Sequence, residues 1–110
     1  MSSIVDIDID GFHKAVISSK TPVLVDFWAP WCGPCIQLTP LIEEVSREYA
    51  DKILVAKVNL DDNMELAREY QVKSIPTLLL FLEGKKIAQK TGLISKEELR
   101  AFIAQATTSV

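Results

Sequence analysis

A strand pattern passes directly into a helix pattern in the first half of the chain, and this restricts the possible folds. Residues 23–28, V-L-V-D-F-W, are rich in β-branched and aromatic residues and are apolar on both faces except at Asp26. Such a run is typical of a central strand that is covered on both sides. From Pro34 to Tyr49 the apolar residues instead recur with the period of a helix. The succession of a buried strand and a helix favours a parallel sheet with helices on its faces.

The rest of the chain continues this alternation. Further strands are expected at residues 4–9, 53–60, 77–82 and 86–91, and further helices at residues 12–16, 62–70 and 95–106. Glu83-Gly84-Lys85 predicts the tight turn of a hairpin, and Ser95 with Glu98 forms a capping box. The order β-α-β-α-β-α-β-β-α predicts one α/β domain over residues 1–110, with a mixed sheet flanked by helices.

Both cysteines, Cys32 and Cys35, lie where the central strand turns into the helix, at the edge where ligands of parallel sheets gather. A structural zinc site needs four ligands. The single histidine, His13, does not complete such a site, so only a site shared between two chains would serve. As a structural staple, a bridge that closes four residues stabilises by roughly 2 kcal/mol in the loop-entropy model. With 48% hydrophobic residues the chain can form a sufficient core and does not need a disulfide for stability.

A redox role accounts for more of the residues around the cysteines. If Cys32 caps the helix and Cys35 is its third residue, the two side chains meet on one face within disulfide range. The positive end of the helix dipole would then favour a Cys32 thiolate and lower its pKa from the usual value of about 8.5. Gly33 lets another chain approach closely, and Pro34 is acceptable in a first turn. Trp31 is the better candidate of the two flanking tryptophans for an exposed contact surface.

Composition argues against several other classes of function. The net charge of −3 and the pI near 5.1 leave no basic surface for nucleic acid or anionic lipid. The longest apolar run, Leu78 to Leu82, is far below the roughly 20 residues of a membrane span. The N-terminal stretch M-S-S-I-V-D-I-D-I-D is acidic and lacks the pattern of a secretory signal, which predicts a cytoplasmic protein. No glycine-rich phosphate loop is present, so no bound nucleotide cofactor is expected.

The segment F-W-A-P-W-C-G-P-C, residues 27–35, resembles the active-site segment of thioredoxins. The resemblance covers about residues 4 to 106 and includes several separate motifs: V-D-F-W, Pro40 inside the following helix, K-V-N-L-D, S-I-P-T-L-L-L-F, and E-G-K with T-G. It implies the thioredoxin fold, a five-stranded mixed β-sheet flanked by four α-helices. It also implies a general protein-disulfide reductase and electron carrier.

The resemblance assigns roles to the residues of the cysteine site. Cys32 would attack a substrate disulfide to form a mixed disulfide, and Cys35 would resolve it. Asp26, desolvated among apolar neighbours, would have a raised pKa and take a proton from Cys35, with Lys57 as its partner. Gly33 and Pro34 would set the geometry and the redox potential of the pair.

The family also implies a binding surface and partners. The Ile75-Pro76 bond would be cis, and the backbone of Ile75 would pair with an extended substrate segment. Trp31, Gly92 and Leu93 would extend this apolar surface. The implied partners are disulfide-containing target proteins and a separate thioredoxin reductase, driven either by nicotinamide and flavin or by ferredoxin. The protein itself is expected to be a monomer without a bound cofactor or metal.

Four residues depart from the family pattern near the site. Ile36 stands where many members have Lys or Arg, and Ser74 stands where glycine is frequent. Pro30 and Thr91 are variants at nearby positions. These departures affect the expected redox potential and partner range rather than the type of reaction. Two rival functions remain open at this point: a dithiol oxidant or isomerase, and a binding module in which the thiols are incidental.

Overall fold

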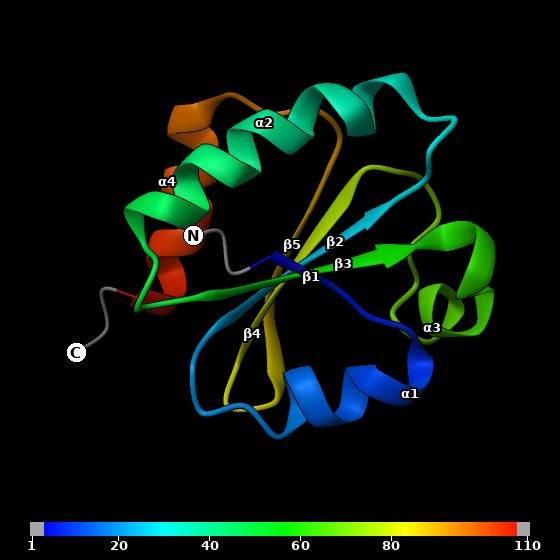
Figure 1. Ribbon diagram of the computed structural model, residues 1–110, viewed down its shortest axis with the longest axis horizontal. Helices are drawn as coiled ribbons and strands as arrows, with labels where there is room; N and C mark the ends of the chain where they lie inside the picture. Colours follow the sequence, from blue (N-terminus) through cyan, green and yellow to red (C-terminus); the bar gives the residue numbers. More distant parts are fainter. Residues whose placement is uncertain (1–3, 108–110) are drawn as a thin grey trace.

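The computed structural model describes residues 4–107, which form a twisted sheet with helices on both faces (Figure 1). The strands are β1 (Ile4–Asp6), β2 (Val23–Trp28), β3 (Leu54–Asn59), β4 (Thr77–Leu82) and β5 (Lys85–Thr91), in the spatial order β1-β3-β2-β4-β5. The first three are parallel to one another, whereas β4 runs antiparallel to β2 and β5 antiparallel to β4. The predicted five-stranded mixed sheet with a late hairpin is therefore confirmed.

The four expected α-helices are also present. They are α1 (Ile9–Phe12), α2 (Gly33–Glu48), α3 (Met64–Glu69) and α4 (Lys96–Thr107). A π-helical turn, His13–Ile17, extends α1, and a 3₁₀ turn, Leu60–Asp62, precedes α3. The capping box of α4 is confirmed, because the Ser95 N–H donates to Glu98 Oε1 at 3.2 Å and the Glu98 N–H donates to Ser95 Oγ at 3.1 Å.

Two separate cores hold the helices against the sheet. On one face, Leu24 of β2 packs with the apolar sides of α2 and α4. On the other face, Val25 and Phe27 of β2 pack with residues of α1 and α3. Figure 1 shows the same division, with α2 and α4 above the sheet and α1 and α3 below it. Since side chains alternate along a strand, β2 is buried on both faces, as its sequence predicts.

The prediction for the N-terminal strand is wrong at its end. The apolar alternation predicts a strand to residue 9, but β1 ends at Asp6. Asp8 instead has an extended backbone and caps α1, with its Oδ1 accepting a hydrogen bond from the Gly11 N–H at 2.8 Å. A side-chain cap of this kind competes with strand pairing, and here it prevails. Residues 1–3 of the acidic N-terminal segment lie outside the described residues.

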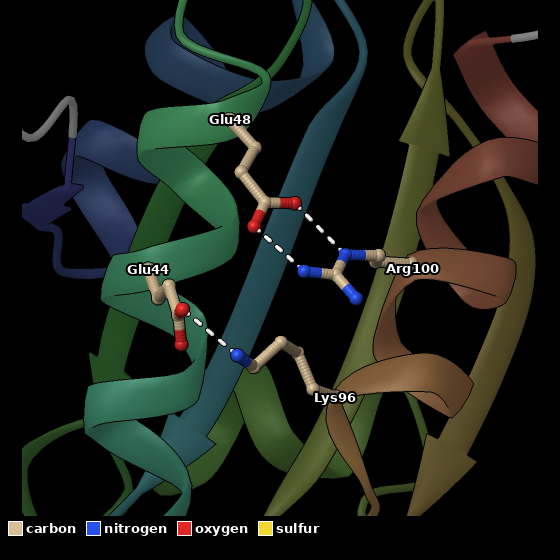
Figure 2. A network of polar contacts seen from close by, with 4 residues as sticks. All are labelled: Glu44, Glu48, Lys96 and Arg100. Atoms are coloured by element: carbon tan, nitrogen blue, oxygen red, sulfur yellow. Dashed lines mark hydrogen bonds and ion pairs between the residues drawn. The ribbon is translucent and has the colours of Figure 1, made fainter.

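Ion pairs join the two helices that cover the upper face. Figure 2 shows Lys96 and Arg100 of α4 pointing toward Glu44 and Glu48 of α2. The Arg100 guanidinium donates to both oxygens of Glu48, at 2.8 and 2.7 Å, and Lys96 Nζ lies 2.8 Å from Glu44 Oε1. Because these side chains are 31–43% exposed, each ion pair contributes little to stability. The core beneath α2 and α4 holds α2 on the sheet, and α2 carries both cysteines at its N-terminal end.

Candidate active site

Cys32 occupies the N-cap of α2. Its backbone is extended, with φ −95° and ψ 106°, and the helix begins at Gly33. Cys35, the third helical residue, donates its backbone N–H to Cys32 Sγ at 3.2 Å. A disulfide joins the two sulfurs, with their Cα atoms 5.3 Å apart. The geometry predicted from the spacing is therefore confirmed, and one of the orphan N–H groups of the helix end, that of Cys35, is bonded to the outer sulfur.

The two cysteines differ in their surroundings. Cys32 is 6% exposed and Cys35 is 1% exposed, so approach from solvent reaches Cys32 first. Both Gly33 and Pro34 are exposed in the first turn. A Cβ built on Gly33 would meet no atom within 4 Å, so the surface beside Cys32 is open to another chain. This arrangement fits an outer sulfur that exchanges with a partner and an inner sulfur that is shielded.

The loop before β4 lies directly beside the disulfide. The Ile75-Pro76 peptide bond is cis, as the resemblance implies, and the Ile75 carbonyl oxygen lies 3.9 Å from Cys32 Sγ. The Pro76 carbonyl accepts a hydrogen bond of 2.8 Å from the Gly92 N–H. Gly92 has a φ of 99°, a left-handed conformation that favours glycine. The fold thus brings Cys32, Ile75, Pro76 and Gly92 together from three separate segments.

Trp31 projects from the turn before Cys32 and is 67% exposed, which confirms its predicted exposure. Its indole N–H donates to both carboxylate oxygens of Asp61, at 3.0 and 3.1 Å. Asp61 is itself held by Asn59, whose Oδ1 accepts from the Asp61 N–H at 2.9 Å. Sequence reasoning missed Asn59 and Asp61. The available signal was their position in K-V-N-L-D, just after a parallel strand and at the edge that carries the cysteines.

Asp26 is a buried carboxylate on the α2 side of the sheet. It is 1% exposed, and it shares a face of β2 with Leu24, which belongs to the core beneath α2 and α4. Cys35 is buried on α2, where it packs with Ala29 and Cys32. Within residues 4–107 neither carboxylate oxygen of Asp26 has a hydrogen-bond partner. Burial raises the pKa of Asp26 from 3.8 to about 7, and the positive charge of Lys57 partly opposes that rise.

Lys57 is aligned with Asp26 in the parallel pairing of β2 and β3. Its ammonium group lies over the ring of Trp28, 4.1 Å from the ring centroid, in a cation–π contact. Lys57 and Trp28 also line an open groove of about 540 Å³ at the ends of β1 and β3. The positive charge of Lys57 therefore lowers the pKa of Asp26 without a direct hydrogen bond, and the Lys57 side chain stays partly exposed to solvent.

Comparison with known proteins agrees with this geometry. A family model described as Thioredoxin matches residues 3–105. The chain belongs to the thioredoxin family. It is 51% identical over 94 residues to a thioredoxin of Acidithiobacillus ferridurans, covering 86% of this chain and 87% of that protein. It is 45% identical over 103 residues to a thioredoxin of Buchnera aphidicola subsp. Acyrthosiphon pisum, covering 94% and 95%. A thioredoxin of Haemophilus influenzae is 42% identical over 105 residues, covering 96% and 98%.

Membership in the thioredoxin family establishes the type of reaction. The chain is a thiol–disulfide oxidoreductase, a protein-disulfide reductase and electron carrier that opens and closes the bond between Cys32 and Cys35. The structure holds the pair in the oxidised state. As a family, thioredoxins act on disulfide-containing proteins and receive electrons from reductases. The function predicted from the sequence is therefore confirmed.

Two further observations concern alternatives weighed from the sequence. Among residues 4–107, no three His, Cys, Asp or Glu side chains are grouped so that they could hold a metal ion. No helix in the same part of the chain combines the length and the apolar character that crossing a membrane requires. The thioredoxin family generally works without a bound cofactor of its own.

Proposed function

We propose that Cys32 is the attacking nucleophile and Cys35 the resolving thiol. In the reduced protein, the Cys32 thiolate would attack one sulfur of a target disulfide, forming a mixed disulfide and releasing the other target sulfur as a thiolate. The Cys35 thiolate would then attack Cys32 Sγ, which restores the intramolecular disulfide and releases the second target thiolate. Two electrons pass from the dithiol to the target, and the two released thiolates take up protons.

The position of Cys32 at the N-cap of α2 is the observation that supports this assignment most strongly. The Cys35 N–H on Cys32 Sγ and the positive end of the helix would stabilise negative charge on that sulfur, both when it attacks and when it leaves. The sulfur of Cys35 has no comparable access, since its residue is 1% exposed. Gly33 and Pro34 form the first turn and would set the redox potential by fixing this geometry.

Asp26 would serve as the proton acceptor for Cys35. A carboxyl group with a pKa of about 7 is partly ionised near neutral pH, which suits an acid–base group in a reaction that runs there. Asp26 lies on the face of β2 that α2 covers, and Cys35 is buried in the first turn of α2, so the proton would pass between them directly or through an intervening water. Lys57 would tune this step, because its charge favours the ionised form of Asp26.

Trp31, Ile75, Pro76 and Gly92 would form the surface that receives the target. These residues border Cys32, and the exposed indole of Trp31 offers apolar contact to many partners. The backbone of Ile75 lies beside the reactive sulfur, so an extended target segment would pair with it as an added strand. Exposed Leu93, which follows Gly92, would extend the same surface.

We also propose the wider setting of this chemistry. Residues 1–110 would act as a single domain and as a cytoplasmic monomer. The electron donor would be a separate thioredoxin reductase, dependent either on nicotinamide and flavin or on ferredoxin. The protein would bind no cofactor or metal, and it would bind neither nucleic acid nor membranes. The family match over residues 3–105 and the acidic net charge of −3 support these assignments.

A trapping experiment tests the assignment of the two cysteines. Reduced Cys35→Ser protein, mixed with insulin, should accumulate as a mixed disulfide through Cys32, because nothing resolves it. Cys32→Ser is the matched control and should trap far less. Equal trapping by both variants would overturn the assignment. Insulin reduction with each class of reductase in turn would then identify the electron donor.

A further inference from the structure

Two threonine hydroxyls form a chain that ends on the loop beside the disulfide. Thr77 Oγ1 donates to the Ser74 carbonyl oxygen at 2.6 Å. The same Oγ1 lies 3.1 Å from Thr91 Oγ1, across the pairing of β4 and β5 that places these residues opposite each other. Thr77 is 1% exposed, whereas Thr91 is exposed at the end of the edge strand. These hydrogen bonds therefore connect the surface to the backbone of the loop before β4.

The direction of donation along this chain follows from the number of protons. A hydroxyl carries one proton, and a carbonyl oxygen only accepts. The single proton of Thr77 is used on the Ser74 carbonyl, so the contact between the two threonines requires Thr91 to donate. The Thr91 hydroxyl then polarises that of Thr77, which strengthens its bond to the loop.

The bond to the Ser74 carbonyl also sets the orientation of the next N–H. The peptide between Ser74 and Ile75 is trans, since the cis bond is the one between Ile75 and Pro76. In a planar trans peptide the N–H points opposite to the C=O. With the Ser74 carbonyl directed toward Thr77, the Ile75 N–H is directed away from it. No hydrogen bond among residues 4–107 is donated by that N–H.

We propose that Thr91 is a positioning residue for the disulfide-reduction reaction. Through Thr77 it fixes the Ser74–Ile75 peptide so that the Ile75 N–H stays available to pair with the backbone of a target protein. The hydrogen bond between the Gly92 N–H and the Pro76 carbonyl is independent of the Thr91 hydroxyl, so loss of the hydroxyl leaves the strand register in place. This inference rests on the proposed pairing of targets with Ile75.

The test compares Thr91→Val, which removes the hydroxyl and keeps the shape, with Thr91→Ser, which keeps the hydroxyl. Reduced proteins are assayed on insulin and on a small aromatic disulfide, which has no peptide backbone to pair with. We expect Thr91→Val to raise the KM for insulin by up to about twofold, because it weakens the Thr77–Ser74 bond without removing it, with little change in kcat. The small disulfide should react at the wild-type rate, and Thr91→Ser should behave as wild type on both substrates.

A second readout does not depend on activity. In amide NMR spectra of the oxidised protein, Thr91→Val should shift the Ile75 N–H resonance and Thr91→Ser should leave it near its wild-type position. Adding Thr91→Val to a Thr77→Val protein should have no further effect, because Thr77→Val already removes the hydroxyl that connects Thr91 to the Ser74 carbonyl. Equal KM values for the Val and Ser variants, equal losses on both substrates, or an unmoved Ile75 resonance would each overturn the inference. Failure of the wild-type protein to reduce insulin would instead overturn the proposed function.

Discussion

Replacing Asp26 with asparagine should remove a pH dependence that the buried carboxylate imposes on stability. Asp26 is 1% exposed, and its oxygens have no hydrogen-bond partner within residues 4–107. Burial raises its pKa from 3.8 to about 7, against the opposing charge of Lys57. Asparagine has nearly the same shape and does not ionise. The two proteins therefore differ in whether a charge must be buried at high pH.

The sign of the effect follows from proton binding. In the folded protein Asp26 keeps its proton up to about pH 7, whereas in the unfolded chain it loses that proton near 3.8. Between these values unfolding releases a proton, so the free energy of unfolding falls as the pH rises. The stability associated with the neutral carboxyl is fully present below about pH 4 and is lost above about pH 7. At about 1.4 kcal/mol for each tenfold change in proton affinity, the loss is about 4 kcal/mol.

Urea unfolding of the oxidised proteins measures this difference. Between about pH 4 and about pH 8.5, the free energy of unfolding of the wild-type protein should fall by about 4 kcal/mol relative to that of Asp26→Asn. Asp51→Asn, which changes an exposed carboxylate, is the control and should show no comparable gain. If the difference between wild type and Asp26→Asn is the same at every pH, burial does not raise the pKa of Asp26 and the reasoning is refuted.

Three further predictions concern the helix pair, the exposed tryptophan and the hairpin turn. Double-mutant cycles with Glu48→Ala and Arg100→Ala should give a favourable coupling energy. This coupling should shrink in high salt, since both side chains are more than a third exposed. No coupling in low salt would contradict the pairing in Figure 2. Asp61→Ala removes both acceptors of the Trp31 indole N–H, so it should alter tryptophan fluorescence and raise the KM for insulin; unchanged values of both would refute a role for that contact. Gly84→Ala would place a Cβ 2.5 Å from a backbone carbonyl oxygen, at a residue whose φ is 81°. Urea unfolding should show that the free energy of unfolding falls by more than about 1 kcal/mol. An unchanged midpoint would exclude this turn geometry.

Patterns within short segments were enough to predict most elements of the fold. The sequence predicts strands at residues 23–28 and 77–82 with the bounds they have, because each is a largely apolar run ended by a turn or a helix signal. The cap of α2 at Cys32 was also predictable, since the helical stripe and the position of Pro34 define the first turn. The end of β1 was not, because a local cap at Asp8 competes with the apolar alternation.

The properties of the site depend on contacts that a linear pattern does not contain. Cys32 and Ile75 are 43 residues apart in the chain, and Trp31 and Asp61 are 30 apart, yet each pair is in contact. The identity of Asp26 is visible in the sequence, but its pKa depends on how completely α2 and the neighbouring strands exclude water from it. Local periodicity reflects backbone geometry over one or two turns, so it specifies elements and the cysteine motif. The sequence indicates which residues tend to be buried, but the extent of burial, the hydrogen-bond partners and the size of the pKa shift are set only when distant segments pack together, and in this protein the tertiary structure decided them.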